Sequence, residues 1–162
     1  MRIMVTNDDG IDSVGLHRLA LAIRHLGEVV VVAPDTEFSG AGCAVGAINK
    51  MNPEIHRVHL DGIDEAWTVS GPPALCVIFA HMGVFGEKFD LVVSGINDGA
   101  NLGDDVLYSG TVAAAMEGRF LGLPSVAISL VHGPGSTRHF ATAAHIARDL
   151  VGRLVSEPLQ SV

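Results

Sequence analysis

The sequence predicts an α/β fold of three layers, a Rossmann-like domain in which a mostly parallel sheet lies between helices. Two observations lead to this prediction. β-Branched runs such as Val29–Ala33 alternate along the chain with segments whose apolar residues recur at helical spacing. In addition, 48% of the 162 residues are hydrophobic and only 17% are charged, which fits strands buried on both faces. We expect one domain over 1–162, because this length suits a single core.

The N-terminal half is expected to begin with a βαβ unit, right-handed by the usual rule. Its parts are the strand Ile3–Val5, a helix over 15–26 and the strand Val29–Ala33. Gly27 stands where a helix C-terminus often requires a left-handed residue. Asp61-Gly62 lies between two further apolar runs, over 55–60 and 67–69, and this pattern predicts a hairpin.

The second half continues the alternation. The expected elements are a helix entered at Pro72-Pro73 and ended near Gly83 or Gly86, a strand over 89–94, a polar loop over 95–105, an Ala-rich helix from Ser109 to about Leu121, a strand over 125–130 and a helix over 140–154. We expect Ser109 or Thr111 to cap the Ala-rich helix. Ile146, Leu150 and Leu154 recur at helical spacing and mark the apolar face of the last helix.

Composition excludes several classes of function. A formal net charge of −8 argues against binding of nucleic-acid polymers, so small molecules are the expected partners. No apolar run reaches the roughly 20 residues of a membrane helix, and Asn7-Asp8-Asp9 comes too early for a signal peptide. A cytoplasmic protein without a membrane partner is expected. Cys43 and Cys76 match no zinc spacing and are predicted to be buried thiols.

The first candidate site is Thr6–Gly10, a polar turn that follows the strand Ile3–Val5. Ligands of open α/β sheets lie beyond the carboxyl ends of the strands, so this turn would deliver Asp8 and Asp9 there. Adjacent, partly dehydrated carboxylates repel each other unless a cation neutralises them. Mg²⁺ is a natural candidate because it accepts one or two carboxylates beside water and phosphate oxygens. A polar turn that only caps the next helix is the alternative.

Other candidate stretches follow later strands. Ser39–Gly42 lies in the loop after the second strand, but its glycines miss the GxGxxG spacing, so an NAD site is not expected. The polar loop Gly95–Asp105 is typical of binding loops. Ser109 and Thr111 place hydroxyls at a helix start, which favours a phosphate, although capping alone would also explain them.

Taken together, several of these stretches closely resemble the survival protein E (SurE) nucleotidases. They are Val5–Ile11, Ala33–Asp35 with Ser39–Gly42, Ser94–Asn97, Gly99–Val112, Ala113–Gly118 and Gly122–Ser129. The resemblance covers nearly the whole chain. It implies a metal-dependent phosphatase that hydrolyses nucleoside 5′- and 3′-monophosphates, with short polyphosphate as a substrate of some members.

The resemblance also implies the site. One divalent cation per subunit, Mg²⁺ or Mn²⁺, would be held by Asp8, Asp9, Ser39 and Asn97, which are all hard oxygen ligands. Asn101 and Ser109-Gly110-Thr111 match the positions that surround the phosphate. We expect water to attack the phosphate with the help of the metal, Asp8 or Asp9 to take its proton, and Asn101 to take part in catalysis. A homodimer or homotetramer is expected.

The sequence departs from the family pattern in three places. Leu75 replaces a polar residue, Thr36 and Phe38 stand where Arg and a polar residue are common, and a C-terminal segment that members exchange between subunits is expected to be absent. The alternative is therefore a catalytically weakened module that binds metal and nucleotide. A receiver domain would need a phosphoacceptor Asp where Ser70 and Ser94 stand, and a haloacid-dehalogenase-type phosphatase would need Asp-x-Asp after the first strand.

Overall fold

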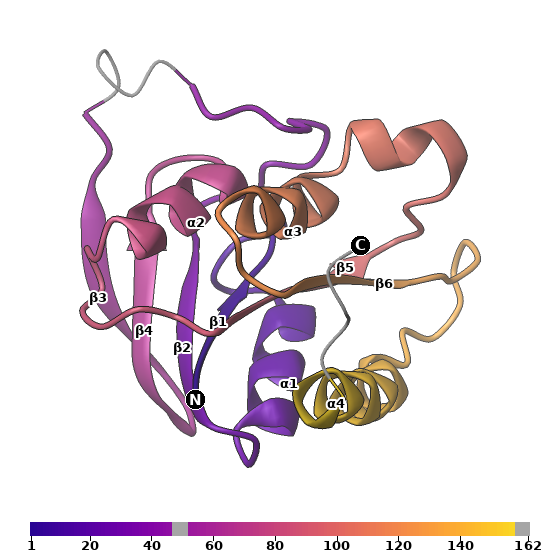
Figure 1. Ribbon diagram of the computed structural model, residues 1–162. Helices are drawn as coiled ribbons and strands as arrows, with labels where there is room; N and C mark the ends of the chain where they lie inside the picture. The colour runs from indigo at the N-terminus through magenta and orange to yellow at the C-terminus, as the bar shows by residue number, and fades with distance from the viewer. Residues whose placement is uncertain (47–51, 158–162) are drawn as a thin grey trace.

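The computed structural model describes residues 1–46 and 52–157. In those residues six strands form one sheet with the order β3-β4-β2-β1-β5-β6 (Figure 1). The strands are β1 (Arg2–Thr6), β2 (Glu28–Pro34), β3 (Ile55–Leu60), β4 (Ile63–Val69), β5 (Leu91–Asp98) and β6 (Ser125–Leu130). All neighbouring pairs are parallel except β3 and β4, which form the predicted antiparallel hairpin. The predicted mostly parallel sheet is confirmed.

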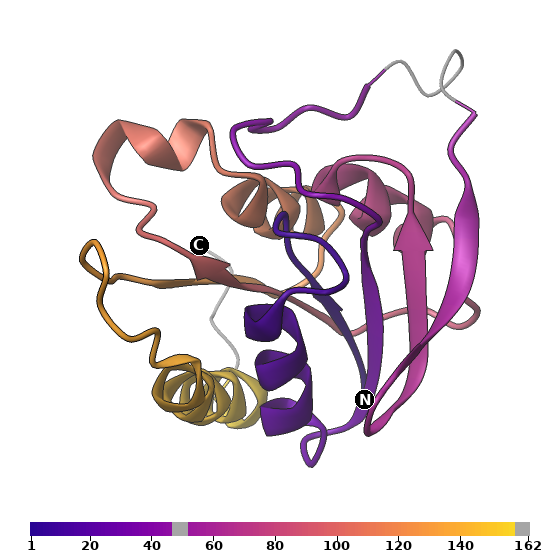
Figure 2. The ribbon, with the colours of Figure 1, turned by 180° about the vertical axis from the view of Figure 1, so that it is seen from behind.

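Helices cover both faces of this sheet. They are α1 (Val14–Ile23), α2 (Pro73–His81), α3 (Gly110–Phe120) and α4 (Phe140–Ser156), and a short 3₁₀ helix, η1 (Gly103–Leu107), precedes α3. Figures 1 and 2 show α1 and α4 on one face and α2 and α3 on the other. The predicted three-layer architecture is therefore confirmed. None of the helices in the described residues is long and apolar enough to span a membrane.

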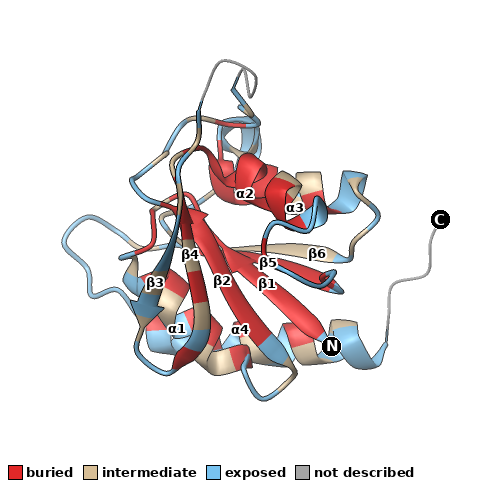
Figure 3. Ribbon diagram, turned by 90° about the vertical axis from the view of Figure 1, so that its left-hand side faces the viewer, coloured by how far each residue is buried: buried red, intermediate tan, exposed pale blue. Residues whose placement is uncertain are grey.

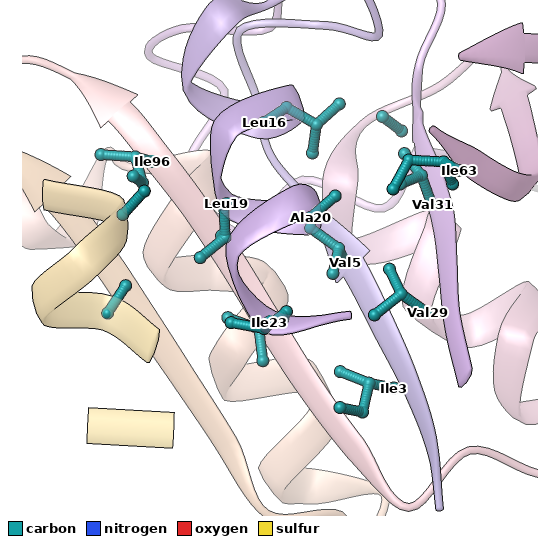
Figure 4. Packing of buried hydrophobic residues seen from close by; sticks show 14 of the residues in the cluster. Ile3, Val5, Leu16, Leu19, Ala20, Ile23, Val29, Val31, Ile63 and Ile96 are labelled. Atoms are coloured by element: carbon teal, nitrogen blue, oxygen red, sulfur yellow. The ribbon is translucent and has the colours of Figure 1, made fainter. Parts of the chain in front are cut away.

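The sheet separates two apolar cores, because successive side chains of a strand point to opposite faces. In β1, Ile3 and Val5 pack against the α1 and α4 layer, whereas Met4 packs against α2. Figure 4 shows the first of these cores, with the apolar face of α1 lying over β1 and β2. That face consists of Leu16, Leu19, Ala20 and Ile23, all fully buried. Burial of a Leu or Ile side chain contributes roughly 1.5–3 kcal/mol.

Exposure differs across the sheet. The central strands β1 and β2 are buried on both faces, while the edge strand β3 is largely exposed (Figure 3). At the opposite edge β6 pairs with β5 alone among the described residues, and each of its residues is half-buried. The loops after β1 and β2 therefore leave the most deeply buried strands of the sheet.

Two expectations about helices were wrong. Gly27 is not left-handed; its lack of a side chain matters because a Cβ there would lie 2.4 Å from the carbonyl oxygen of Met1. The predicted apolar face of α4 is not the buried one, since Ile146 is 65% and Leu150 43% exposed. The helix instead packs through Phe140, Ala144, Ala147 and Val151, because small residues let it approach α1 closely.

Two further expectations need correction. β5 continues to Asp98, four residues into the predicted loop 95–105, because Asn97 and Asp98 pair with Ser129 and Leu130 of β6. Cys76 is buried as predicted, but Cys43 is exposed, since the loop that carries it lies outside the apolar cores.

Candidate active site

Loops that follow β1, β2 and β5 meet at the carboxyl edge of the sheet. Together with residues next to α1 and α4 they line a cleft of about 640 Å³. Of the predicted metal ligands, Asp9, Ser39 and Asn97 line this cleft. It occupies the place where open α/β sheets bind their ligands.

Asp8 is buried, and the start of α3 holds its carboxylate. The backbone amide of Gly110 donates a hydrogen bond of 3.0 Å to Oδ2 of Asp8, and the hydroxyl of Thr111 donates to Oδ1. Glycine is required at position 110, because a Cβ there would lie 2.7 Å from the Cβ of Asp8. The carboxylate is thus fixed in orientation by groups more than 100 residues away in sequence.

Asn97 joins the same group through its side-chain oxygen. The Oδ1 atom of Asn97 lies 3.5 Å from the hydroxyl oxygen of Thr111. Its Nδ2 donates to the carbonyl oxygen of Gly99 at 3.1 Å. The Thr111 hydroxyl therefore contacts both the carboxylate of Asp8 and an Asn97 oxygen that could ligate a cation.

Asp9 has a different environment from its neighbour. Its Oδ2 atom is buried and has no hydrogen-bond partner among the described residues. Burial, followed by the negative charge of Asp8, raises the pKa of Asp9 to about 6, while a hydrogen bond from the backbone amide of Asp98 opposes this rise. An unsatisfied buried acceptor costs roughly 1–3 kcal/mol. A cation bound here would give Oδ2 of Asp9 a partner and would offset the repulsion between the carboxylates of Asp8 and Asp9. The carboxylate pair therefore fits a hard metal ion.

Ser39 lies at the exposed rim of the cleft, where its hydroxyl donates to Oε1 of Glu37 at 2.8 Å. The loop that carries Ser39 is attached to the first turn, because the amide of Phe38 donates to the carbonyl oxygen of Asp8 at 2.7 Å. No cluster of three His, Cys, Asp or Glu side chains in the described part of the chain could hold a metal. The remaining ligands of the predicted set are accordingly the Ser39 hydroxyl and the Asn97 amide oxygen.

The predicted phosphate-binding residues lie in two groups. Gly110 and Thr111 contact Asp8 directly, and Ser109 caps α3 by accepting a hydrogen bond of 3.2 Å from the amide of Val112. Of the two residues considered as caps, Ser109 is the one that caps the helix. Asn101 lies in the loop after β5, and its Nδ2 donates to the hydroxyl of Ser129 at 2.7 Å. It does not line the cleft.

Charged residues that no motif in the sequence marks also belong to the cleft. Glu37, Asp98 and Arg138 line it, and His132 contacts Asp98. The sequence signal for Asp98 was its place in a polar stretch after a strand. Arg138 follows a segment that carries no motif, so no pattern in the sequence marked it.

Leu75, which departs from the family pattern, belongs to α2 and is fully buried between this helix and the sheet. Its side chain packs with Met4 and Val30 on the face of the sheet opposite α1. The change to leucine therefore adds apolar packing at a position that a ligand in the cleft does not reach.

The chain matches known proteins over nearly its whole length. Residues 3–162 match the family model described as Survival protein SurE. Proteins named 5′-nucleotidase SurE from Stenotrophomonas maltophilia and Xanthomonas euvesicatoria are 50% and 49% identical over 98% of this chain. The chain spans about 60% of the length of these curated relatives.

A solved structure shows the same fold. The SurE protein from Aquifex aeolicus superimposes with a TM-score of 0.86 and is 38% identical in sequence, over 98% of this chain and 62% of the other. The family model covers nearly every residue, and the fold agrees with that of a solved member. The chain therefore belongs to the SurE family.

Proposed function

We propose that this chain forms the catalytic part of a metal-dependent phosphatase that hydrolyses nucleoside 5′-monophosphates. The name 5′-nucleotidase of relatives about 50% identical supports the reaction class. The observation that carries the proposal is the buried, unpartnered Oδ2 of Asp9 beside the fixed carboxylate of Asp8. Nucleoside 3′-monophosphates and short polyphosphate are further proposed substrates, because the same phosphoryl chemistry serves them.

One divalent cation, Mg²⁺ or Mn²⁺, would be held by Asp8, Asp9, Ser39 and Asn97. When bound, the cation supplies charge neutralisation at the phosphate and a lower pKa for a bound water. The donor set fits such an ion, because it offers carboxylate, amide and hydroxyl oxygens and no sulfur.

Asp8 and Asp9 are proposed to have different roles in the reaction. Asp8 is held in place by Gly110 and Thr111, so its proposed role is to keep a fixed negative charge. Asp9, whose Oδ2 has no hydrogen-bond partner among the described residues, is proposed to hold the cation and to accept the proton of the attacking water. No nucleophilic side chain is needed in this scheme.

The phosphate is proposed to bind at the start of α3. Ser109, Gly110 and Thr111 lie at the N-terminus of this 11-residue helix, whose dipole favours an anion. The Gly110 amide and the Thr111 hydroxyl already donate to Asp8, so their proposed effect on the phosphate is through the position of that carboxylate. Asn101 now donates to Ser129. It is proposed to give up this hydrogen bond and to donate to a further phosphate oxygen instead. Positioning and electrostatics supply most of the acceleration in phosphoryl transfer.

Release of phosphate from AMP, measured with Mg²⁺, with Mn²⁺ and with EDTA, tests the proposal. We expect turnover with a metal and none with EDTA. A catalytically weakened module that binds metal and nucleotide is the second candidate, because the predicted catalytic residue Asn101 does not line the cleft. Calorimetric binding of AMP without turnover would select that candidate, and turnover that persists in EDTA would contradict both.

An assembly of subunits and a cytoplasmic location are also proposed. Phe120, Ile146 and Leu150 are exposed apolar side chains, which supports assembly into a homodimer or homotetramer. Cys43 and Cys76 are free thiols, which suits the reducing cytoplasm. Light scattering during gel filtration tests the assembly, and a monomer at micromolar concentration would contradict it.

A further inference from the structure

The cleft is strongly acidic, and one cationic side chain lines it. Among its described lining residues the acidic ones are Asp9, Asp12, Glu37 and Asp98, and the cation is Arg138. A phosphate monoester carries up to two negative charges and would be repelled by this lining. A single bound divalent ion would not neutralise both the acidic lining residues and the phosphate. A second positive group beside the metal would therefore reduce the repulsion of the phosphate.

Arg138 is held in a way that leaves much of its guanidinium available. Its Nε lies 2.7 Å from Oδ1 and 2.6 Å from Oδ2 of Asp98. The two terminal amino groups of Arg138 donate no hydrogen bond to any residue that the structure describes, and 51% of the side chain is exposed. The planar guanidinium matches the geometry of phosphate, which it can bind with two parallel hydrogen bonds.

Asp98 fixes the place of this group from the end of β5. Besides Arg138, it contacts the ring Nε2 of His132 at 2.8 Å. His132 and Arg138 lie near the two ends of the segment between β6 and α4, so one carboxylate attaches both ends of this segment to the cleft. The guanidinium is thereby pre-positioned, which lowers the entropy lost when a ligand binds.

We propose that Arg138 is a phosphate-binding residue of this cleft, and that Asp98 and His132 are residues that position it. The terminal amino groups of Arg138 would contact a phosphate oxygen of the substrate and of the inorganic phosphate that is released. The identity of the substrate rests on the proposed function, but binding of inorganic phosphate does not require turnover.

Calorimetric titration of inorganic phosphate in the presence of Mg²⁺ tests this role in the wild type and three variants. Arg138→Ala is expected to weaken phosphate binding about tenfold, the usual order for a lost charge-assisted contact, and Arg138→Lys to recover part of it. Arg148→Ala is the matched control, because Arg148 is paired with its neighbour Asp149 on α4 at 2.9 Å. It should bind phosphate as the wild type does.

Kinetics with AMP add a second readout. An interaction made equally in the ground and transition states changes KM alone, so we expect Arg138→Ala to raise KM about tenfold with little change in kcat. The inference would be overturned if the wild type and Arg138→Ala bound phosphate with the same affinity. It would also be overturned if neither protein bound phosphate detectably. A wild type that binds phosphate but does not hydrolyse AMP would refute the proposed function and leave the phosphate titration to decide the role of Arg138.

Discussion

The hydroxyl of Thr111 donates a hydrogen bond to the carboxylate of Asp8, which lies 103 residues earlier in the sequence. This contact joins the start of α3 to the turn after β1 and fixes one of the two adjacent carboxylates. Groups that orient metal ligands in this way typically change metal affinity or activity by about 10–100-fold when they are removed.

Thr111→Val should therefore lower metal-dependent turnover about 10–100-fold and destabilise the fold by roughly 1.5–3 kcal/mol, the range for a hydrogen bond to a charged group. Thr111→Ser keeps the hydroxyl and is the control. AMP hydrolysis at several Mg²⁺ concentrations and urea unfolding provide the two measurements. Wild-type metal dependence in Thr111→Val would show that this hydrogen bond does not position Asp8.

Asp8→Ala tests the carboxylate itself. Metal-dependent phosphate release should be abolished, and the loss of the acceptor for Gly110 and Thr111 should cost roughly 1–3 kcal/mol of stability. Asp8→Asn retains most of the packing and separates the two effects. A circular dichroism melt confirms folding of each variant, and turnover equal to that of the wild type would remove the central assumption of the proposed function.

The raised pKa of Asp9 predicts how the metal-free protein responds to pH. Because the pKa is about 6 in the fold against 3.8 as the ordinary value, folding favours the protonated acid. The stability that this proton provides is present at low pH and is lost as pH rises through about 6. Urea unfolding in EDTA at several pH values measures the trend.

Asp9→Asn cannot ionise at this position and serves as the comparison for that experiment. Its unfolding free energy should fall less between pH 4 and 7 than that of the wild type. The two proteins share all other titrating groups, so the difference between their profiles reports on Asp9 alone. Added Mg²⁺ should stabilise the wild type at pH 7 more than the variant. Parallel pH profiles of the two proteins would contradict the assigned environment of Asp9.

Gly110→Ala should disrupt the site by steric contact. The new Cβ would lie 2.7 Å from the Cβ of Asp8, so the carboxylate must move, at a cost of about 1–3 kcal/mol. Loss of turnover together with a lower melting temperature is expected. Gly133→Ala is the matched control, since no heavy atom lies within 4 Å of a Cβ built there; equal melting temperatures for the two variants would refute the steric argument.

The two thiols should differ in reactivity. Cys43 is exposed, whereas Cys76 is fully buried, and burial raises the pKa of the Cys76 thiol. A thiol reagent such as DTNB should label one group at once in the native protein and the second only after unfolding. Cys43→Ser should remove the fast phase. Fast labelling of both thiols in the native state would show that the core around α2 opens readily.

The strands could be predicted from the sequence because runs such as Val29–Ala33 have few other stable environments. The orientation of α4 could not, because hydropathy favours Ile146 while the close packing on α1 selects Ala144 and Ala147. Small residues carry a weak hydropathy signal even where they decide how two helices meet.

The candidate site was predicted in part for a similar reason. Asp8 and Asp9 are adjacent in sequence and follow a strand, so their place at the sheet edge follows from topology. The contact between Asp98 and Arg138 joins residues 40 positions apart, and no local pattern records it. Tertiary structure alone brings these two side chains together.

The two margins of the sheet have opposite chemical character. The outer strand β3 carries His56, Arg57 and His59, and charged or polar side chains of this kind discourage pairing with another chain. The outer strand β6, with the sequence SVAISL, has no charge and pairs only with β5 in the part of the chain that the structure describes. A strand from a neighbouring molecule can therefore pair with β6 more readily than with β3.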